Sequence, residues 1–162
     1  MQPAHESAVL ALAEAYLAEE TAAQSVEASE LTAAEALLMF YSRLAAAQQA
    51  GLASVLLGDD GRVYGMLLAL TDEALPEVPR SAALVSDAYV VREMRRGASA
   101  YPLWRSLCDA VRDAGKTHLY ASTRNERLHS LLRKLGFVSH PGLPLEEPDA
   151  AWFRLTLAVA RS

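Results

Sequence analysis

One stretch of the chain, residues 82–137, constrains the fold more than any other part because strand-like and helix-like patterns alternate along it. Its first segment is β-branched and aromatic and is short enough for a buried strand. From Pro102 onward, apolar residues recur three or four positions apart, which is typical of a helix. Asn125 and Gly136 are typical residues for the start and the end of a further helix. The predicted order is strand, turn, helix, strand, helix, over residues 83–91, 92–97, 102–115, 116–123 and 125–136.

The turn after the first strand has the composition of an anion site. Residues 96–100 are small or flexible at the point where a strand gives way to a helix. Their backbone N–H groups can converge with the positive end of the helix dipole, and bulky side chains would hold a pyrophosphate away. Arg95 and Arg96 add positive charge. The alternative is an ordinary small-residue turn into a helix.

Two motifs in this stretch resemble the GNAT superfamily of N-acetyltransferases, which use acetyl-coenzyme A. Residues 95–100 (RRGASA) resemble the phosphate loop Gln/Arg-x-x-Gly-x-Gly/Ala of that family. Residues 125–137 (NERLHSLLRKLGF) resemble its second signature, Asn-x-x-Ala-x-x-(apolar)-Tyr-x-Lys-x-Gly-Phe. Either motif alone is weak, but both occur at the right separation and on the right elements.

The resemblance implies a cosubstrate, a site and a reaction. Acetyl-CoA would lie between two neighbouring parallel strands that splay apart, here residues 83–91 and 116–123. The chain would then transfer the acetyl group to a primary amine of a small molecule or peptide. The implied cofactor-binding residues are Tyr89, Val90, Val91, Arg95, Arg96, Gly97, Ala98, Ser99, Ala100 and Asn125.

Two departures from the family pattern keep a second function open. Ala98 stands where the family usually has glycine, and Leu132 stands where many members place the tyrosine that protonates the departing thiolate. The alternative is therefore a GNAT-fold module that binds acyl-CoA, or assembles with a partner, with weak or no catalysis. His129, one turn before Leu132 on the same helix face, is a candidate substitute acid, and solvent is the other candidate.

Asp87 is the first candidate for the residue that recognises or deprotonates the amine. It lies two residues before Tyr89 and so shares that face of the strand. A carboxylate can take the proton of the amine directly or through water. A structural ion pair is the alternative role for Asp87. Asp72 and Glu73, at the end of the preceding strand, are second choices.

The rest of the chain completes a mixed α/β fold. Amphipathic helices are predicted over residues 6–21 and 33–50, a hairpin over 52–57 and 62–71, and a closing strand over 151–159. Residues 1–3 are read as the remnant of a first strand and 138–150 as mostly loop. We expect one GNAT-like domain over residues 1–162, with a mixed, mostly antiparallel sheet, splayed central parallel strands and helices on both faces. Aromatic residues of the first two helices are candidate acceptor contacts or core residues: Tyr16, Phe40 and Tyr41.

Composition narrows the classes of function. The 162 residues carry a net charge of −5, with 12 acidic and 3 basic side chains in residues 1–80 against 8 and 12 in residues 81–162. The basic half fits a polyanionic cosubstrate, while the overall charge and the lack of a recognition motif argue against nucleic acid. Cys108 is the single cysteine and is read as a packing residue. No metal site, leader or membrane span is predicted, so a cytoplasmic location is expected. A homodimer is left open.

Overall fold

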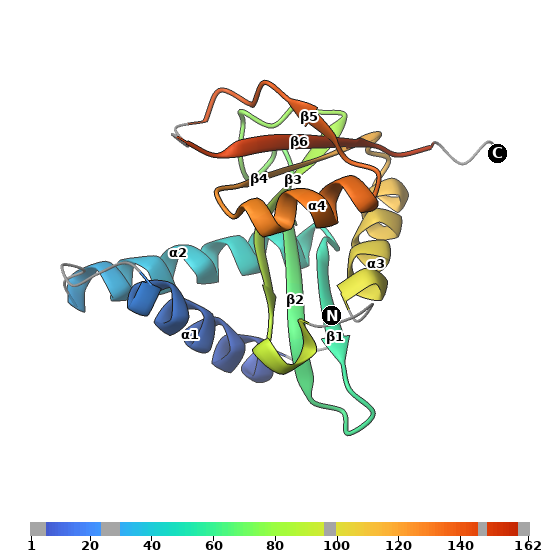
Figure 1. Cartoon of the computed structure of the whole chain (residues 1–162). Coiled ribbons are helices and arrows are strands. Elements are labelled where there is room, and N and C mark those ends of the chain that lie inside the picture. The colour runs from blue at the N-terminus through green and yellow to red at the C-terminus, as the bar shows by residue number, and fades with distance from the viewer. Residues whose placement is uncertain (1–5, 24–29, 96–99, 146–148, 159–162) are drawn as a thin grey trace.

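The computed structural model describes residues 6–23, 30–95, 100–145 and 149–158. Two helices come first, and strands and helices alternate after them (Figure 1). The helices are α1 (Glu6–Ala23), α2 (Glu30–Gln49), α3 (Ala100–Asp113) and α4 (Glu126–Lys134), with a short 3-10 helix η2 (Arg92–Met94). The strands are β1 (Ala53–Leu57), β2 (Val63–Leu70), β3 (Ala82–Val90), β4 (His118–Thr123), β5 (Val138–His140) and β6 (Ala151–Thr156).

The six strands form one sheet in the order β1-β2-β3-β4-β6-β5. Every neighbouring pair is antiparallel except β3 and β4, which run parallel. The helix α3 connects these two parallel strands, as a parallel pair requires a crossover connection. This confirms the predicted mixed, mostly antiparallel sheet with a central parallel pair.

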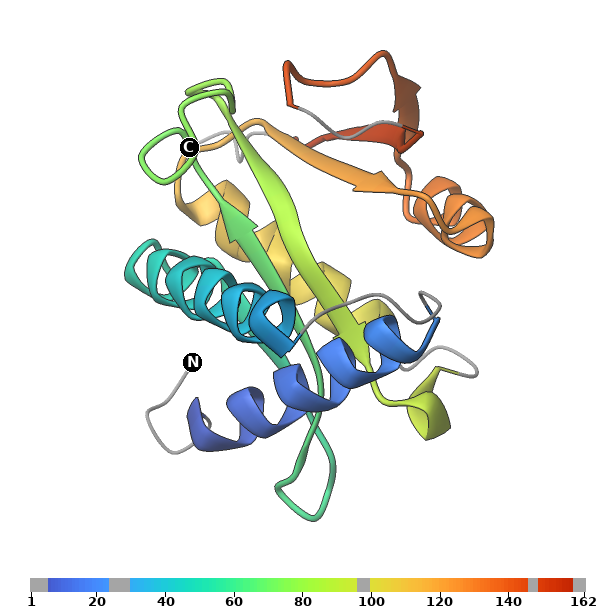
Figure 2. The ribbon, with the colours of Figure 1, turned by 90° about the vertical axis from the view of Figure 1, so that its left-hand side faces the viewer.

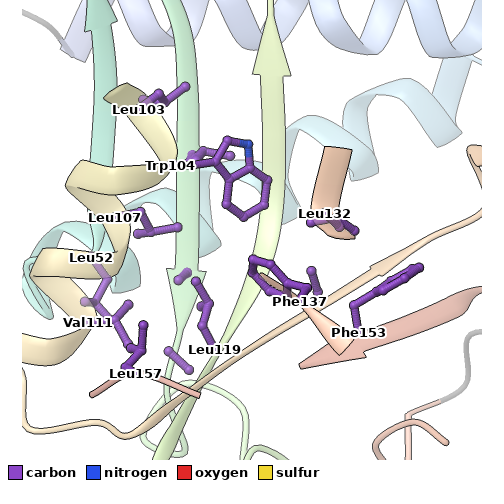
Figure 3. Close-up of a cluster of buried hydrophobic side chains, with 14 residues drawn as sticks. Leu52, Leu103, Trp104, Leu107, Val111, Leu119, Leu132, Phe137, Phe153 and Leu157 are labelled. Atoms are coloured by element: carbon purple, nitrogen blue, oxygen red, sulfur yellow. The ribbon is translucent and has the colours of Figure 1, made fainter. Parts of the chain in front are cut away.

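Helices cover both faces of the sheet. Figure 2 shows α1 and α2 on the near side of β2 and β3, with α3 behind these strands. Buried side chains of α1 and α2 pack with Met66, Leu68 and Leu70 of β2. On the other face, the main core joins Leu103 and Leu107 of α3 to the sheet and to α4 (Figure 3). Neighbouring residues of β2 therefore face different helices, as the period of two requires.

Local signals in the sequence explain several element boundaries. The side chain of Asn125 accepts a hydrogen bond from the backbone N–H of Arg127 and caps α4. Gly136 has a φ of 92°, the left-handed conformation that ends a helix. Between β1 and β2, Gly58 and Arg62 close the predicted hairpin with a hydrogen bond of 2.9 Å.

Two segments differ from the prediction, and a third is not among the described residues. The helix α2 begins at Glu30, three residues before the predicted start. The strand β5 lies within the predicted loop over 138–150, because its three residues pair with the edge of β6. The predicted first strand over 1–3 lies outside the described residues. No helix in the described part of the chain is long and apolar enough to cross a bilayer.

Candidate functional site

The parallel strands β3 and β4 pair over only three residues each. Ala82, Ala83 and Leu84 are the partners in β3, at its N-terminal end. Beyond Leu84 the register to β4 stops, although β3 continues to Val90 and β4 to Thr123. Figure 2 shows the two strands diverging from this point. The sheet therefore opens in its middle, and the predicted splay of the central strands is confirmed.

A bulge in β3 lies where the gap begins. The pairing of β2 with β3 shifts between Leu68, opposite Asp87, and Ala69, opposite Val85. Ser86 is thus the extra residue of β3. A bulge bends its strand and increases the local twist, which turns the second half of β3 away from β4.

The backbone of β3 turns specific groups toward the gap. Val91 donates its N–H to the carbonyl of Tyr64. At this end of β3, Val91 and Tyr89 therefore form the backbone hydrogen bonds to β2. In an antiparallel ladder the residues between them point their N–H and C=O groups the other way. Ala88 and Val90 therefore face the gap, while Tyr89 and Val91 face β2. The side chain of Ala88 is exposed although both neighbours, Asp87 and Tyr89, are buried.

One residue of β4 lines the opposite edge. Leu157 donates its N–H to the carbonyl of Thr117, and β6 then pairs along the whole of β4. The same alternation makes Ser122 point its backbone groups away from β6 and into the gap. The gap is thus bordered by polar backbone of Ala88, Val90 and Ser122, and it fits an extended ligand that supplies complementary amides.

Arg95 closes part of the β3 edge. Its Nε donates a hydrogen bond of 2.6 Å to the carbonyl of Val90, and its guanidinium lies 5.2 Å from the ring centroid of Tyr89. The predicted phosphate loop continues from here, but Arg96, Gly97, Ala98 and Ser99 lie outside the described residues. The loop ends at Ala100, the first residue of α3. Asn125, another predicted cofactor contact, is exposed at the N-terminus of α4.

Asp87 forms an ion pair with Arg43 of α2. Its two carboxylate oxygens accept hydrogen bonds from Nε and Nη2 of Arg43, each 2.8 Å long. The side chain of Asp87 is 3% exposed and that of Arg43 is 29% exposed. Hydrogen bonding to Asp87 raises the pKa of the Arg43 guanidinium. The structural ion pair considered for Asp87 therefore exists, and a role as base requires the carboxylate to accept a proton while Arg43 holds it.

Leu132 and His129 lie in apolar surroundings on α4. Leu132 is buried in the core cluster beside α3 (Figure 3). The ring of His129 lies 5.1 Å from that of Phe153 in β6. Its Nε2 is buried and has no hydrogen-bond partner. His129 thus contacts β6, the neighbour of β4 on the side away from β3.

The other candidates lie away from the gap or pack in the core. Asp72 accepts a 3.0 Å hydrogen bond from Lys116, beside the end of the sheet where β3 and β4 still pair. Glu73 is exposed in the same loop. Cys108 packs against the α3 core, and burial raises the pKa of its thiol. Phe40 is fully buried under α1, whereas Tyr41 is exposed. No three His, Cys, Asp or Glu side chains of the described residues gather into a metal site.

Sequence reasoning missed Arg43 as a member of the site. A signal was present, since Arg43 is one of only three basic residues in the first 80 and lies in an otherwise apolar part of α2. A cation in such a place needs a buried partner. The pattern does not say which acid supplies it, because the two residues are 44 positions apart.

The arrangement of the strands and helices is that of solved GNAT proteins. An acetyltransferase of the GNAT family from Staphylococcus aureus is 8% identical and covers 98% of this chain and 96% of its own, with a TM-score of 0.69. A GNAT-family protein from Desulfovibrio desulfuricans is 14% identical over 97% of this chain and 95% of its own, with a TM-score of 0.65. N-acetylglutamate synthase from Neisseria gonorrhoeae, solved with coenzyme A and N-acetyl-glutamate, is 18% identical. That match covers 66% of this chain but only 26% of the synthase, with a TM-score of 0.56.

These likenesses define the class of fold. The chain has the GNAT fold, as the splayed parallel pair and the helix order predict. At these identities the likeness is one of fold alone. The sequence matches no family model, and a search of curated proteins gives no match.

Proposed function

We propose that the chain is an N-acetyltransferase that moves the acetyl group of acetyl-CoA to a primary amine of a small molecule or peptide. The observation that carries the proposal is the gap between β3 and β4, where the pairing stops after three residues and leaves polar backbone uncovered. An extended amide-bearing arm such as pantetheine can pair with such an edge like an added strand. The Neisseria synthase, which shares the fold, was solved with coenzyme A.

The predicted contacts follow from the direction of the backbone. Val90 and Ala88 offer N–H and C=O groups to the pantetheine arm, while Tyr89 and Val91 hold the strand to β2. The loop from Arg95 to Ala100, with Arg96, Gly97, Ala98 and Ser99, would bind the pyrophosphate at the start of α3. Asn125 would contact the arm from the start of α4 in addition to its role as N-cap. Arg95 would leave the carbonyl of Val90 when the arm pairs with it.

The chemistry requires a neutral amine, a polarised thioester and a protonated leaving thiolate. Backbone N–H groups at the bulged part of β3 can stabilise charge on the thioester oxygen. Asp87, as part of its pair with Arg43, is the proposed contact for the amine or its proton. His129 or solvent would protonate the thiolate, because the core position of Leu132 offers no acid.

The decisive experiment separates the enzyme from a binding module of the same fold. Release of coenzyme A thiol from acetyl-CoA should depend on an added amine from a panel of polyamines, amino acids, aminoglycosides and peptides. Saturable acetyl-CoA binding in calorimetry without release in any panel member would favour the binding module. Absence of binding would overturn both.

One variant tests the assigned edge. Ala88→Pro removes an N–H that faces the gap but no hydrogen bond to β2, and proline is tolerated where the N–H of a strand points outward. We expect weaker acetyl-CoA binding with an unfolding midpoint close to that of the parent. Ala53→Pro, in the edge strand β1, is the matched control outside the gap. Equal acetyl-CoA affinity of parent and Ala88→Pro would rule out pairing at this edge.

A further inference from the structure

Arg154 lies on the same face of the sheet that α1 and α2 cover at β2. It sits in β6 and pairs across the sheet with Tyr120 of β4. Side chains alternate along a strand, so Arg154 shares the face of Trp152 and lies opposite to Phe153. Trp152 and Tyr120 pack with Leu84 of β3 in one buried cluster on this face. Leu84, Tyr120 and Arg154 are therefore neighbours across β3, β4 and β6. They lie at the last position where β3 and β4 still pair.

Arg154 has no acidic partner among the described residues. Its Nε is buried from solvent and has no hydrogen-bond partner, and none of the ion pairs between described residues includes it. Two other arginines are paired with acids: Arg43 binds Asp87, and Arg112 binds Asp109. A buried cationic donor that lacks an acceptor is unfavourable, and a bound anion would relieve that cost.

A buried acid on this face could attract a cation instead. Among the described residues Asp87 is the only buried acid. Both of its oxygens are engaged by Arg43, so the pair is close to neutral. Asp87 lies three residues beyond Leu84, or about 10 Å along β3, and Arg154 lies two strand spacings from Leu84, or about 10 Å across the sheet. A small ligand can therefore reach from the gap to Arg154.

We infer that the acceptor is an amine that also carries an anionic group, a carboxylate or a phosphate, and that Arg154 binds this group. The inference rests on the proposed acetyl transfer and narrows its acceptor class. The amine points to the gap, and the anion lies against Arg154 beside Tyr120 and Trp152. The planar fork of a guanidinium suits a carboxylate or a phosphate. Arg154 is then a specificity residue and takes no part in the bond changes.

The test compares matched acceptors. Initial rates with acetyl-CoA are measured for amino acids, for their carboxamides and for aminoalkyl phosphates. We expect the acid or the phosphate of a matched set to exceed the neutral analogue in kcat/KM by about tenfold or more, because a hydrogen bond to a charged group is at stake. Comparison of kcat/KM between the carboxylic acids and the phosphates decides which anionic group the acceptor carries. Equal rates for charged and neutral acceptors overturn the inference.

Variants assign the effect to one side chain. Arg154→Gln should raise the KM of the anionic acceptor by about tenfold or more and leave the neutral analogue unchanged, while Arg154→Lys should restore part of the loss. Arg133→Gln is the control, because the Arg133 guanidinium lies over the ring of Phe153, on the opposite face. An equal loss for both acceptors in Arg154→Gln would mean a structural role and would overturn the inference.

Binding of products separates this inference from the proposed function. Calorimetry with N-acetyl amino acids and N-acetyl amino amides, in the presence of coenzyme A, needs no turnover. Selective binding of the acids that is lost in Arg154→Gln supports the anion site even in a chain that transfers no acetyl group. Transfer to simple amines with no selectivity for a charged group upholds the enzyme and rejects the anion site.

Discussion

Arg43 and Asp87 are joined side by side, with Nε to Oδ2 and Nη2 to Oδ1 both at 2.8 Å. The pair ties α2 to β3 immediately after the bulge at Ser86. Because Asp87 is buried, its negative charge depends on Arg43 for compensation. The pair thus joins α2, which packs on β1 and β2, to the strand that borders the opening of the sheet.

Removal of one partner should be far more harmful than removal of both. Arg43→Met leaves the buried carboxylate of Asp87 without a cation, and we expect a loss of about 3 kcal/mol in the free energy of unfolding, measured by urea denaturation. The double variant Arg43→Met with Asp87→Leu should recover most of that loss. A double variant as unstable as the single one would contradict this account.

Gly65 should not tolerate a side chain. A Cβ at this position would lie 3.0 Å from the carbonyl oxygen of Tyr89 and 3.0 Å from Cγ2 of Val90. Backbone yields little, so Gly65→Ala should lower the unfolding free energy by about 1–3 kcal/mol. It should also shift the β3 edge and weaken acetyl-CoA binding in calorimetry. A variant with the stability and affinity of the parent would show that the strand adjusts freely.

Much of the fold was predictable because its signals are local. The core stretch of strands and helices, the hairpin and the cap at Asn125 each depend on residues close in sequence. The strand β5 was missed because its three residues pair with the edge of β6 and have no strand pattern of their own. The direction of each backbone group at the gap depends on the register between β2 and β3. No local sequence pattern indicates that register.

The sequence was enough to place the candidate acid Asp87 on its strand, but not to identify the side chain that pairs with it. Asp87 was predicted from its place on the strand face of Tyr89, and its two possible roles could not be separated without its neighbour. Arg43 comes from an element far away in the chain, so its charge meets Asp87 only in three dimensions. The contacts assigned to Arg96, Gly97, Ala98 and Ser99 stay predictions.

The Lys116–Asp72 pair should make stability depend on acid pH. Hydrogen bonding to Lys116 lowers the pKa of Asp72 below its usual value of 3.8. The unfolded chain then binds more protons than the folded one near and below pH 4, so this contribution is complete above that value and is lost as pH falls through the folded pKa. In Lys116→Met the unfolding midpoint should fall less steeply from pH 5 to pH 2.

The second lysine provides the control for that measurement. Lys134 is exposed in the last turn of α4, so Lys134→Met should keep the acid dependence of the parent. An identical pH profile for the parent and Lys116→Met would show that Asp72 does not gain stability from the pair.

His129 can be tested without disturbing its packing. His129→Phe replaces an imidazole whose Nε2 is buried and unsatisfied, so stability should be unchanged or higher by up to about 1 kcal/mol. If His129 protonates the departing thiolate, kcat for thiol release should fall by roughly a hundred-fold or more. An unchanged kcat would remove His129 from the mechanism and leave solvent as the proton donor.

The three-residue contact between β3 and β4 also has a mechanical consequence. The six strands amount to two three-stranded sheets, β1-β2-β3 and β4-β6-β5. The two sheets are joined only by the pairing of β3 with β4, which extends over Ala82–Leu84 of β3. Under tension across that pairing few hydrogen bonds share the load, and they break in sequence from the open end. The two halves should therefore separate one hydrogen bond at a time, starting at the open end. In a hydrogen-exchange experiment, the backbone amides of His118 and Tyr120 should exchange before the amides that are bonded between β2 and β3.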